Sequence, residues 1–211
     1  MKVTVIDYGI GNLFSVARAL ERCGAEARLS SDPVEIAAAE RLILPGVGAF
    51  EDGINGLRER GLVDAIRRHA ASDRPLLGIC LGMQMLASVS EEFGEHEGLG
   101  LIEGRVVPVK KTTTAGIPLK IPHIGWSPIR PAKGMQWKGT PLADIEPETS
   151  MYLVHSFHVE TRHREHLLAV CDYGGHEVSA AIRSGRVTGC QFHPEKSGEA
   201  GLAVLRTFLA L

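Results

Sequence analysis

The sequence lacks long apolar runs, paired cysteines and any excess of charge. No stretch approaches the roughly 18 apolar residues of a membrane span, and the N-terminal apolar run meets an acid and two glycines too early for a signal-peptide core. The cysteines lie far apart, without a CxxC pair or the spacing of a zinc site or disulfide scaffold. They indicate free thiols in a reducing compartment, so we expect a cytoplasmic protein.

The charges nearly cancel. The chain has 23 basic and 25 acidic residues, so no large field favours nucleic acid or an anionic membrane, and we expect neither as a partner. With 211 residues and 44% hydrophobic content, the chain can bury one good core and is short for two. We therefore expect a single domain over residues 1–211, without repeats or linkers.

Strands alternate with helices in the first half of the sequence. Continuous apolar runs rather than alternating ones predict strands of a parallel sheet covered on both faces, at Val3–Ile6, Leu42–Leu44 and Pro75–Ile79. Helical spacing predicts helices at Leu13–Cys23, Gly56–His69 and Met83–Phe93. The predicted class is α/β, with a mostly parallel central sheet and helices on both faces.

The second half is predicted to be mostly strands and hairpins that extend this sheet with an antiparallel portion. Its last segment, from Gly201, has the pattern of a helix, and Lys110–Lys120 and Pro131–Pro147 are predicted loops. The expected strand segments are Ile102–Val109, Ile121–Ile129, Met151–Glu160, His166–Gly174, Val178–Val187 and Val187–Glu195.

The stretch GICLG, from Gly78 to Gly82, fits a nucleophile elbow. In such an elbow a strand turns sharply into a helix, and the strained nucleophile tolerates almost no side chain beside it. Cys80 would lie just before the N-terminus of the following helix, where the helix dipole favours a thiolate. The alternative is a buried cysteine in a tight glycine turn, and this pattern alone leaves both open.

Two further motifs match this interpretation. In GCQFHPE, Pro194 favours an extended backbone before it, so that His193 and Glu195 can point to the same side as base and orienting carboxylate. In PGVG, glycines leave the amides of Val47 and Gly48 free for an oxyanion, together with the amide of Leu81. Alone, each motif is equally consistent with an ordinary turn, but all should lie at the sheet end where α/β folds bind ligands.

In this order and at these separations, PGVG, GICLGMQ and QFHPE resemble the class I, triad-type glutamine amidotransferases over essentially the whole chain. The resemblance implies a flavodoxin-like fold and no cofactor. It implies that Cys80 attacks the glutamine side-chain amide, that His193 transfers protons and that Glu195 orients the ring. It also implies substrate binding by Gly48, Gln84, Glu92, Ser156 and Phe157. Without the resemblance, Gln84 and Glu92 would be solvent-facing helix residues.

Further stretches, DYGIGNL, PGVGAF, PHIGW and VHSFH, resemble the members of this family that serve histidine biosynthesis. Those members imply glutamine as substrate and, as partner, a (β/α)₈-barrel cyclase subunit that uses the ammonia to make imidazole glycerol phosphate and AICAR. The expected interface residues are Asn12, Trp126, Tyr152 and Lys196, with a core aromatic as the alternative for Trp126.

Other functions are less well supported by the residues. The glycines of GIG and GVG suggest dinucleotide binding, but Phe14 and Glu51 replace the third glycine of the fingerprint. The pairs His155/His158 and His163/His166 lack a further cluster of ligands, so we expect no metal. An amidotransferase of another pathway, such as anthranilate or pyridoxal phosphate synthesis, and a non-catalytic scaffold with a buried Cys80 remain as alternatives.

Overall fold

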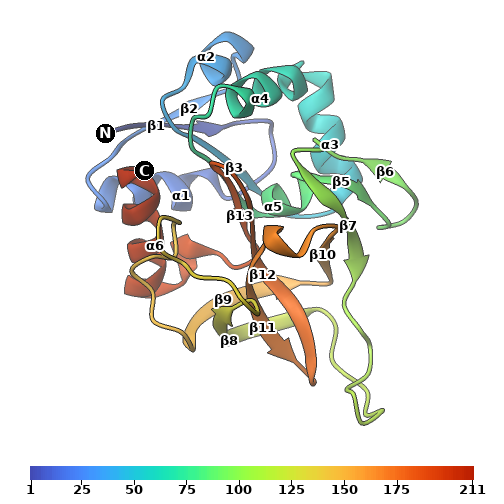
Figure 1. Ribbon diagram of the computed structural model, residues 1–211. Helices are drawn as coiled ribbons and strands as arrows, with labels where there is room; N and C mark the ends of the chain where they lie inside the picture. The colour runs from blue at the N-terminus through green and yellow to red at the C-terminus, as the bar shows by residue number, and fades with distance from the viewer.

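A nine-stranded sheet runs through the middle of the computed structural model, which describes residues 1–211 (Figure 1). Its strand order is β2-β1-β3-β4-β13-β12-β11-β8-β9. These strands are β1 Lys2–Ile6, β2 Glu26–Ser30, β3 Leu42–Gly46, β4 Leu76–Cys80, β8 His123–Pro131, β9 Thr149–His155, β11 Leu167–Tyr173, β12 His176–Ser184 and β13 Val187–Cys190.

This sheet is parallel on one side and antiparallel on the other. Strands β2, β1, β3, β4 and β13 pair in parallel, whereas β13, β12, β11, β8 and β9 pair antiparallel. The first group consists of the βα units in the sequence, whose crossover helices require parallel neighbours. The predicted α/β class, with an added antiparallel portion from the second half, is confirmed.

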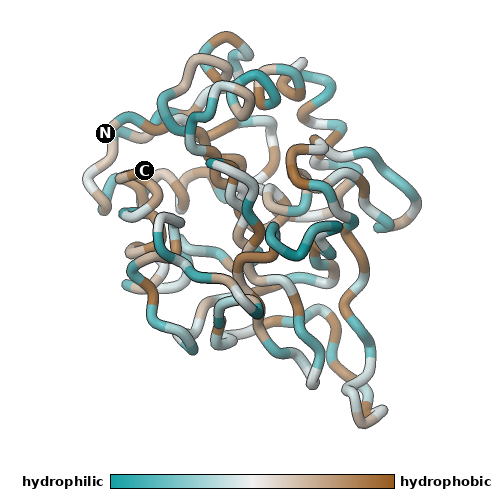
Figure 2. The backbone as a smooth tube through the Cα atoms, in the orientation of Figure 1, coloured by the Kyte–Doolittle hydropathy of each residue, from teal (hydrophilic) through white to brown (hydrophobic).

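Helices cover both faces of the sheet, as predicted. One core lies under α1 (Leu13–Arg22) and α6 (Gly198–Ala210), and the other under α2 (Pro33–Ala38), α3 (Phe50–Glu59), α4 (Leu62–Ala71) and α5 (Leu81–Met85). Figure 2 shows the apolar segments concentrated in the central strands. Short 3₁₀ turns at Arg164–His166 and Pro194–Lys196 complete the elements, and none of the helices combines the length and hydropathy that crossing a membrane requires.

The single helix predicted over Gly56–His69 is wrong. The chain forms two helices, α3 and α4, which are separated at Gly61. Gly61 has φ of 65°, a left-handed conformation that ends one helix and redirects the chain into the next. Both helices pack on the same core, so the helical spacing of apolar residues continues across Gly61. The spacing alone therefore did not indicate the break between the helices.

The helix predicted over Met83–Phe93 is also wrong beyond its first turn. Helix α5 ends at Met85, and β5 (Ala87–Ser90) follows. The amides of Leu99 and Leu101 take the carbonyls of Met85 and Leu86, which removes acceptors that a longer helix would need. Helix α5 therefore has only five residues, and its dipole is small.

A second sheet, which the sequence did not predict, lies beside the first. Its four strands have the order β10-β7-β5-β6, where β6 is His96–Glu97, β7 is Ile102–Pro108 and β10 is Phe157–Thr161. The expected strand segment Met151–Glu160 is therefore two strands, one in each sheet. The chain passes between the sheets at Ser156, whose carbonyl accepts the amide of Val109.

The first predicted loop, Lys110–Lys120, projects from the body of the protein below β7 (Figure 1). Its two arms are joined by a bridge between Thr112 and Pro118. The second predicted loop, after β8, packs Trp137 and Leu142 into the core under α6 and is largely a series of turns.

Candidate active site

The predicted site residues meet at the carboxyl ends of the parallel strands, where α/β sheets bind ligands. A cavity of about 270 Å³ opens there, with polar and apolar residues in its wall. All of the predicted triad, oxyanion and substrate-binding residues line it except Glu195, which lies behind His193. The lining residues are Val47, Gly48, Cys80, Leu81, Gln84, Glu92, Pro122, Val154, His155, Ser156, Phe157 and His193.

Cys80 occupies a strained elbow between β4 and α5. Its φ of 55° and ψ of −110° are unusual for a residue with a side chain. The flanking glycines are required by contact. A Cβ at Gly78 would lie 2.7 Å from the carbonyl oxygen of Gly82, and a Cβ at Gly82 would lie 1.8 Å from that of Leu44. The expected elbow backbone is therefore present.

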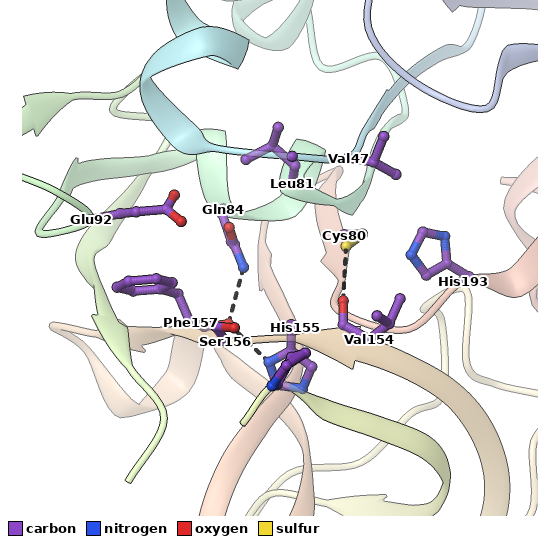
Figure 3. Close-up of a pocket in the computed structure, with 12 residues that line it drawn as sticks. Val47, Cys80, Leu81, Gln84, Glu92, Val154, His155, Ser156, Phe157 and His193 are labelled. Atoms are coloured by element: carbon purple, nitrogen blue, oxygen red, sulfur yellow. Dashed lines mark hydrogen bonds between the residues drawn. The ribbon is translucent and has the colours of Figure 1, made fainter. Parts of the chain in front are cut away.

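His193 and Glu195 form a buried pair. The Nδ1 of His193 lies 2.8 Å from Oε1 of Glu195, and both side chains are almost fully buried. Figure 3 shows the imidazole beside the thiol of Cys80, and its Nε2 has no hydrogen-bond partner. Burial alone lowers the pKa of His193, but Cys80 and Glu195 outweigh it and raise this pKa to about 9. The ring is therefore cationic at neutral pH.

Neighbouring residues fix the position of this histidine. The hydroxyl of Ser197 donates to the carbonyl of His193 at 2.7 Å, and the amide of Tyr152 donates to the Ser197 hydroxyl at 3.0 Å. The amide of His193 in turn donates to the carbonyl of Tyr152. Tyr152 in the middle of β9 thus holds the His193 backbone, directly and through Ser197.

The PGVG loop is tethered by a residue from the first strand unit. The hydroxyl of Tyr8 is buried and donates to the carbonyl of Pro45 at 2.8 Å. A Cβ at Gly46 would lie 2.5 Å from that hydroxyl, so glycine is needed for the contact. Gly48 has φ of 96° and open space around it, and Val47 is partly exposed. The loop is therefore held at Pro45, whereas Val47 and Gly48 are exposed and Gly48 has space around it.

Gln84 and Glu92 are not the solvent-facing helix residues that their sequence context alone would suggest. Gln84 is buried and donates to the carbonyl of Phe157 at 3.0 Å. Glu92 lies beyond α5, and its Oε2 accepts the amide of Phe50 at 2.7 Å, which caps α3. Glu92 also lines the cavity.

Sequence reasoning missed His155, Pro122 and Val154 of the cavity wall and Gln191, which supports it. Gln191 is fully buried, accepts from Gln84 at 3.1 Å, and its Nε2 lies 3.7 Å from the sulfur of Cys80. His155 lines the cavity and is bonded to the carbonyl of Phe157. Gln191 and His155 belong to the quoted motifs QFHPE and VHSFH, so their place in these motifs was the available indication.

The four predicted interface residues differ in their exposure. Asn12 and Lys196 are exposed, Tyr152 is half-buried, and Trp126 is 57% exposed, which rules out a core role for it. The rings of Trp126 and Tyr152 pack edge to face at 6.0 Å. Tyr152 also contacts the backbone of His193, so this aromatic pair adjoins the site.

The two histidine pairs considered as metal ligands make other contacts, and the rings of His163 and His166 pack edge to face with centroids 5.5 Å apart. His155 is bonded to His123 and to the Phe157 carbonyl, whereas His163 lies against Glu103 on the surface. No group of three or more His, Cys, Asp or Glu side chains is placed to share a metal ion.

An elbow cysteine beside a His-Glu pair at the strand ends of an α/β sheet is the site of a triad-type amidotransferase. Consistent with this geometry, residues 4–210 match the class I glutamine amidotransferase family, and the chain belongs to that family. Among its relatives is "Imidazole glycerol phosphate synthase subunit HisH 1" of Legionella pneumophila (strain Lens), 49% identical over 210 residues that cover 99% of each chain. The HisH subunit of Geobacillus thermodenitrificans is 46% identical, over 99% of this chain and 95% of the relative.

Solved structures with this fold include PurLQS from Thermotoga maritima, with a TM-score of 0.74 and 22% identity over 99% of this chain and 97% of that one. A glutamine amidotransferase from the same organism has a TM-score of 0.66 and 15% identity, over 99% of this chain and 96% of that one. These likenesses support the fold, and the predicted family is confirmed.

Proposed function

We propose that this chain is the glutaminase subunit of imidazole glycerol phosphate synthase, acting as one amidotransferase domain over residues 1–211 in the cytoplasm. The observation that carries the proposal is the single cavity lined by Cys80, by His193, whose pKa is raised, and by Val47 and Gly48 of the PGVG loop. The full-length relatives named HisH support the assignment to this synthase rather than to another pathway.

The chemistry follows from these groups. The thiolate of Cys80 attacks the side-chain amide carbon of glutamine, and the amides of Val47, Gly48 and Leu81 stabilise the oxyanion. The carbon–nitrogen bond breaks, ammonia leaves with a proton from His193, and a γ-glutamyl thioester remains. Water, deprotonated by His193, then releases glutamate and the free thiol. Glu195 keeps the ring oriented and stabilises its protonated form before ammonia leaves and after water is deprotonated.

The rest of the cavity suits the amino-acid end of glutamine. The carboxylate of Glu92 takes the ammonium, and the backbone at Ser156 and Phe157 receives the carboxylate of glutamine. Gln84 supports this turn through its hydrogen bond to the Phe157 carbonyl. The site thereby binds both the ammonium and the carboxylate of a free amino acid. This selects glutamine over amides that lack these two charged groups.

The ammonia passes to a separate cyclase subunit with a (β/α)₈ barrel, which uses it to make imidazole glycerol phosphate and AICAR. The exposed Trp126 and the half-buried Tyr152, which pack edge to face, form the docking surface together with Asn12 and Lys196. Its proximity to His193 suits a partner that controls the site. Large exposed aromatics of this kind are typical anchors of protein interfaces.

In Glu195→Gln, the loss of glutaminase activity at high pH should begin at a lower pH than in the wild-type chain. The carboxylate helps raise the pKa of His193 to about 9, so activity that needs the imidazolium is present below this value and lost as pH rises through it. Without the carboxylate, this loss moves to lower pH, and kcat falls at least about tenfold. The measurement is the pH profile of glutamine hydrolysis by the complex with the cyclase.

Glu199→Gln is the control, because Glu199 is an exposed glutamate that pairs only with surface arginines. Its profile should match that of the wild-type chain. An unchanged alkaline limb in Glu195→Gln would remove the carboxylate from its proposed role.

The decisive experiment is glutamate release from glutamine, measured with the purified chain alone and then with the cyclase and the nucleotide ligand of the cyclase. Strong release only in the mixture is the expected result. Glutamate release at the same rate with and without the cyclase would indicate an amidotransferase of another pathway, such as anthranilate synthesis. Folded protein without release in either case would favour a non-catalytic role.

A further inference from the structure

Two buried histidines that the proposed chemistry does not use lie at the cavity: His155 is part of its wall, and His123 is bonded to His155 but does not line the cavity. His123 of β8 and His155 of β9 are direct partners in the antiparallel ladder. His123 Nδ1 lies 3.2 Å from His155 Nε2, and the two residues are 3% and 5% exposed. Buried imidazoles need defined partners for both nitrogens, because an unpaired polar atom in the interior costs free energy.

The outer nitrogens of the pair have such partners. His155 Nδ1 lies 2.9 Å from the carbonyl oxygen of Phe157, and His123 Nε2 lies 2.9 Å from the hydroxyl of Ser127. The ring of Tyr173 stacks on His123 with centroids 4.0 Å apart, which fixes its plane. The result is a continuous chain of hydrogen bonds from β8 to the turn between β9 and β10.

The direction of every bond in this chain follows from chemistry. A carbonyl oxygen only accepts, so Nδ1 of His155 carries the hydrogen. Burial lowers the pKa of His155 to about 3, so the ring is neutral and its Nε2 accepts. Nδ1 of His123 must then donate. Burial lowers the pKa of His123 as well, so its Nε2 accepts from Ser127. Both rings hold the Nδ1–H tautomer.

The chain ends on an oxygen of the substrate site. The carbonyl of Phe157 accepts from His155 and also from Gln84 Nε2, and Figure 3 shows both dashed lines meeting there. Gln84 continues to Gln191, whose amide nitrogen faces the sulfur of Cys80. The Ser156–Phe157 turn is therefore held from two sides, by β8 through the histidines and by α5 through Gln84.

Given the proposed glutaminase function, we infer that His123 is a positioning residue that acts through His155. Its Nδ1–H fixes the tautomer and orientation of His155, and His155 fixes the Ser156–Phe157 turn in the geometry that receives the amino-acid end of glutamine. The hydroxyl of Ser127 donates to Nε2 of His123 and so fixes the tautomer of His123. Without the donor on His123, Nε2 of His155 becomes a buried acceptor with no partner, and the grip on the Phe157 carbonyl weakens.

The kinetic test uses the complex with the cyclase and varies only His123. His123→Phe keeps a ring to stack on Tyr173 but removes the donor, and it should raise KM for glutamine about tenfold while kcat stays within about threefold. In His123→Asn, the amide nitrogen is two covalent bonds from Cβ, as Nδ1 of histidine is, and it can donate the same hydrogen bond. This variant should therefore restore KM toward the wild-type value. A merely structural role would not be rescued by asparagine.

A control separates this effect from general loss of stability. His69 is another buried histidine, bonded to the carbonyl of Pro75, which precedes β4 at the opposite end of the strand from Cys80. His69→Phe should lower stability and leave KM unchanged. Ser127→Ala should raise KM in the same direction as His123→Phe, and it decides the question if His123→Phe does not fold.

A spectroscopic measurement on the chain alone tests the hydrogen-bond chain independently of activity. Nitrogen-15 shifts of the ring nitrogens at neutral pH should report neutral Nδ1–H tautomers for both His123 and His155, and the His155 signal should change in Ser127→Ala. An Nε2–H tautomer or an imidazolium at either ring overturns the inference, as does an unchanged KM in both His123→Phe and Ser127→Ala. Correct tautomers in a chain without glutaminase activity would instead refute the proposed function.

Discussion

Replacing Cys80 by alanine is expected to abolish glutamine hydrolysis and leave the fold intact. Loss of the nucleophile of a catalytic triad costs about 10⁴-fold or more in kcat, because no other group can form the thioester. The fold persists because alanine retains the Cβ, so the strained backbone at φ 55° is no worse than before. The measurement is glutamate release by the complex, together with urea unfolding of the chain.

Two variants sharpen this result. Cys23→Ala changes a cysteine near the surface, away from the cavity, and should keep full activity. Cys80→Gly should be as inactive as Cys80→Ala but more stable by about 1 kcal/mol, since glycine adopts a positive φ without strain. Measurable turnover by Cys80→Ala would show that Cys80 is not the nucleophile.

Replacing Gly82 by alanine should prevent correct folding at the elbow. A Cβ at this position would lie 1.8 Å from the carbonyl oxygen of Leu44, which belongs to the backbone of β3 and cannot rotate away. Strand β3 or helix α5 would have to move, and both form walls of the cavity. We expect a loss of more than about 3 kcal/mol in the free energy of unfolding, seen by urea denaturation or as insoluble protein.

Gly24→Ala is the matched control. Gly24 follows α1 with φ of 79° and has no atom within 4 Å of the added Cβ, so only the backbone cost applies. That cost is about 1 kcal/mol. Equal unfolding midpoints for the two variants would mean that the close approach between Gly82 and Leu44 does not constrain the elbow.

Local features of the chain could be predicted from the sequence. The continuous apolar runs predicted the parallel strands, since strands buried on both faces need apolar side chains on both sides. Gly78 and Gly82 predicted the elbow at Cys80, because only glycine fits so close to neighbouring backbone. Family motifs pointed to His193 and Glu195, and the structure places their side chains in contact.

The predictions failed where distant segments compete for the same backbone groups. The sequence around Ala87 continues a helical pattern, yet the amides of Leu99 and Leu101 take the helix acceptors and α5 ends. Likewise, the apolar segment Met151–Glu160 contributes a strand to each sheet. It divides at Ser156, whose carbonyl accepts the amide of Val109. Such contacts join residues far apart in the chain, so no local pattern records them.

The sequence alone predicted the elbow and the order of the βα units, because each depends on neighbours within a few positions. It predicted the residues of the proposed triad only through the resemblance of its short motifs to a known family. Only the tertiary structure decided which side chains support them. Tyr8 holds the PGVG loop, Gln191 faces the Cys80 sulfur, and His123 orients His155. These contacts depend on how strands from both halves of the chain are ordered in the sheet, and a buried polar group is fixed by whichever partner that order brings within reach.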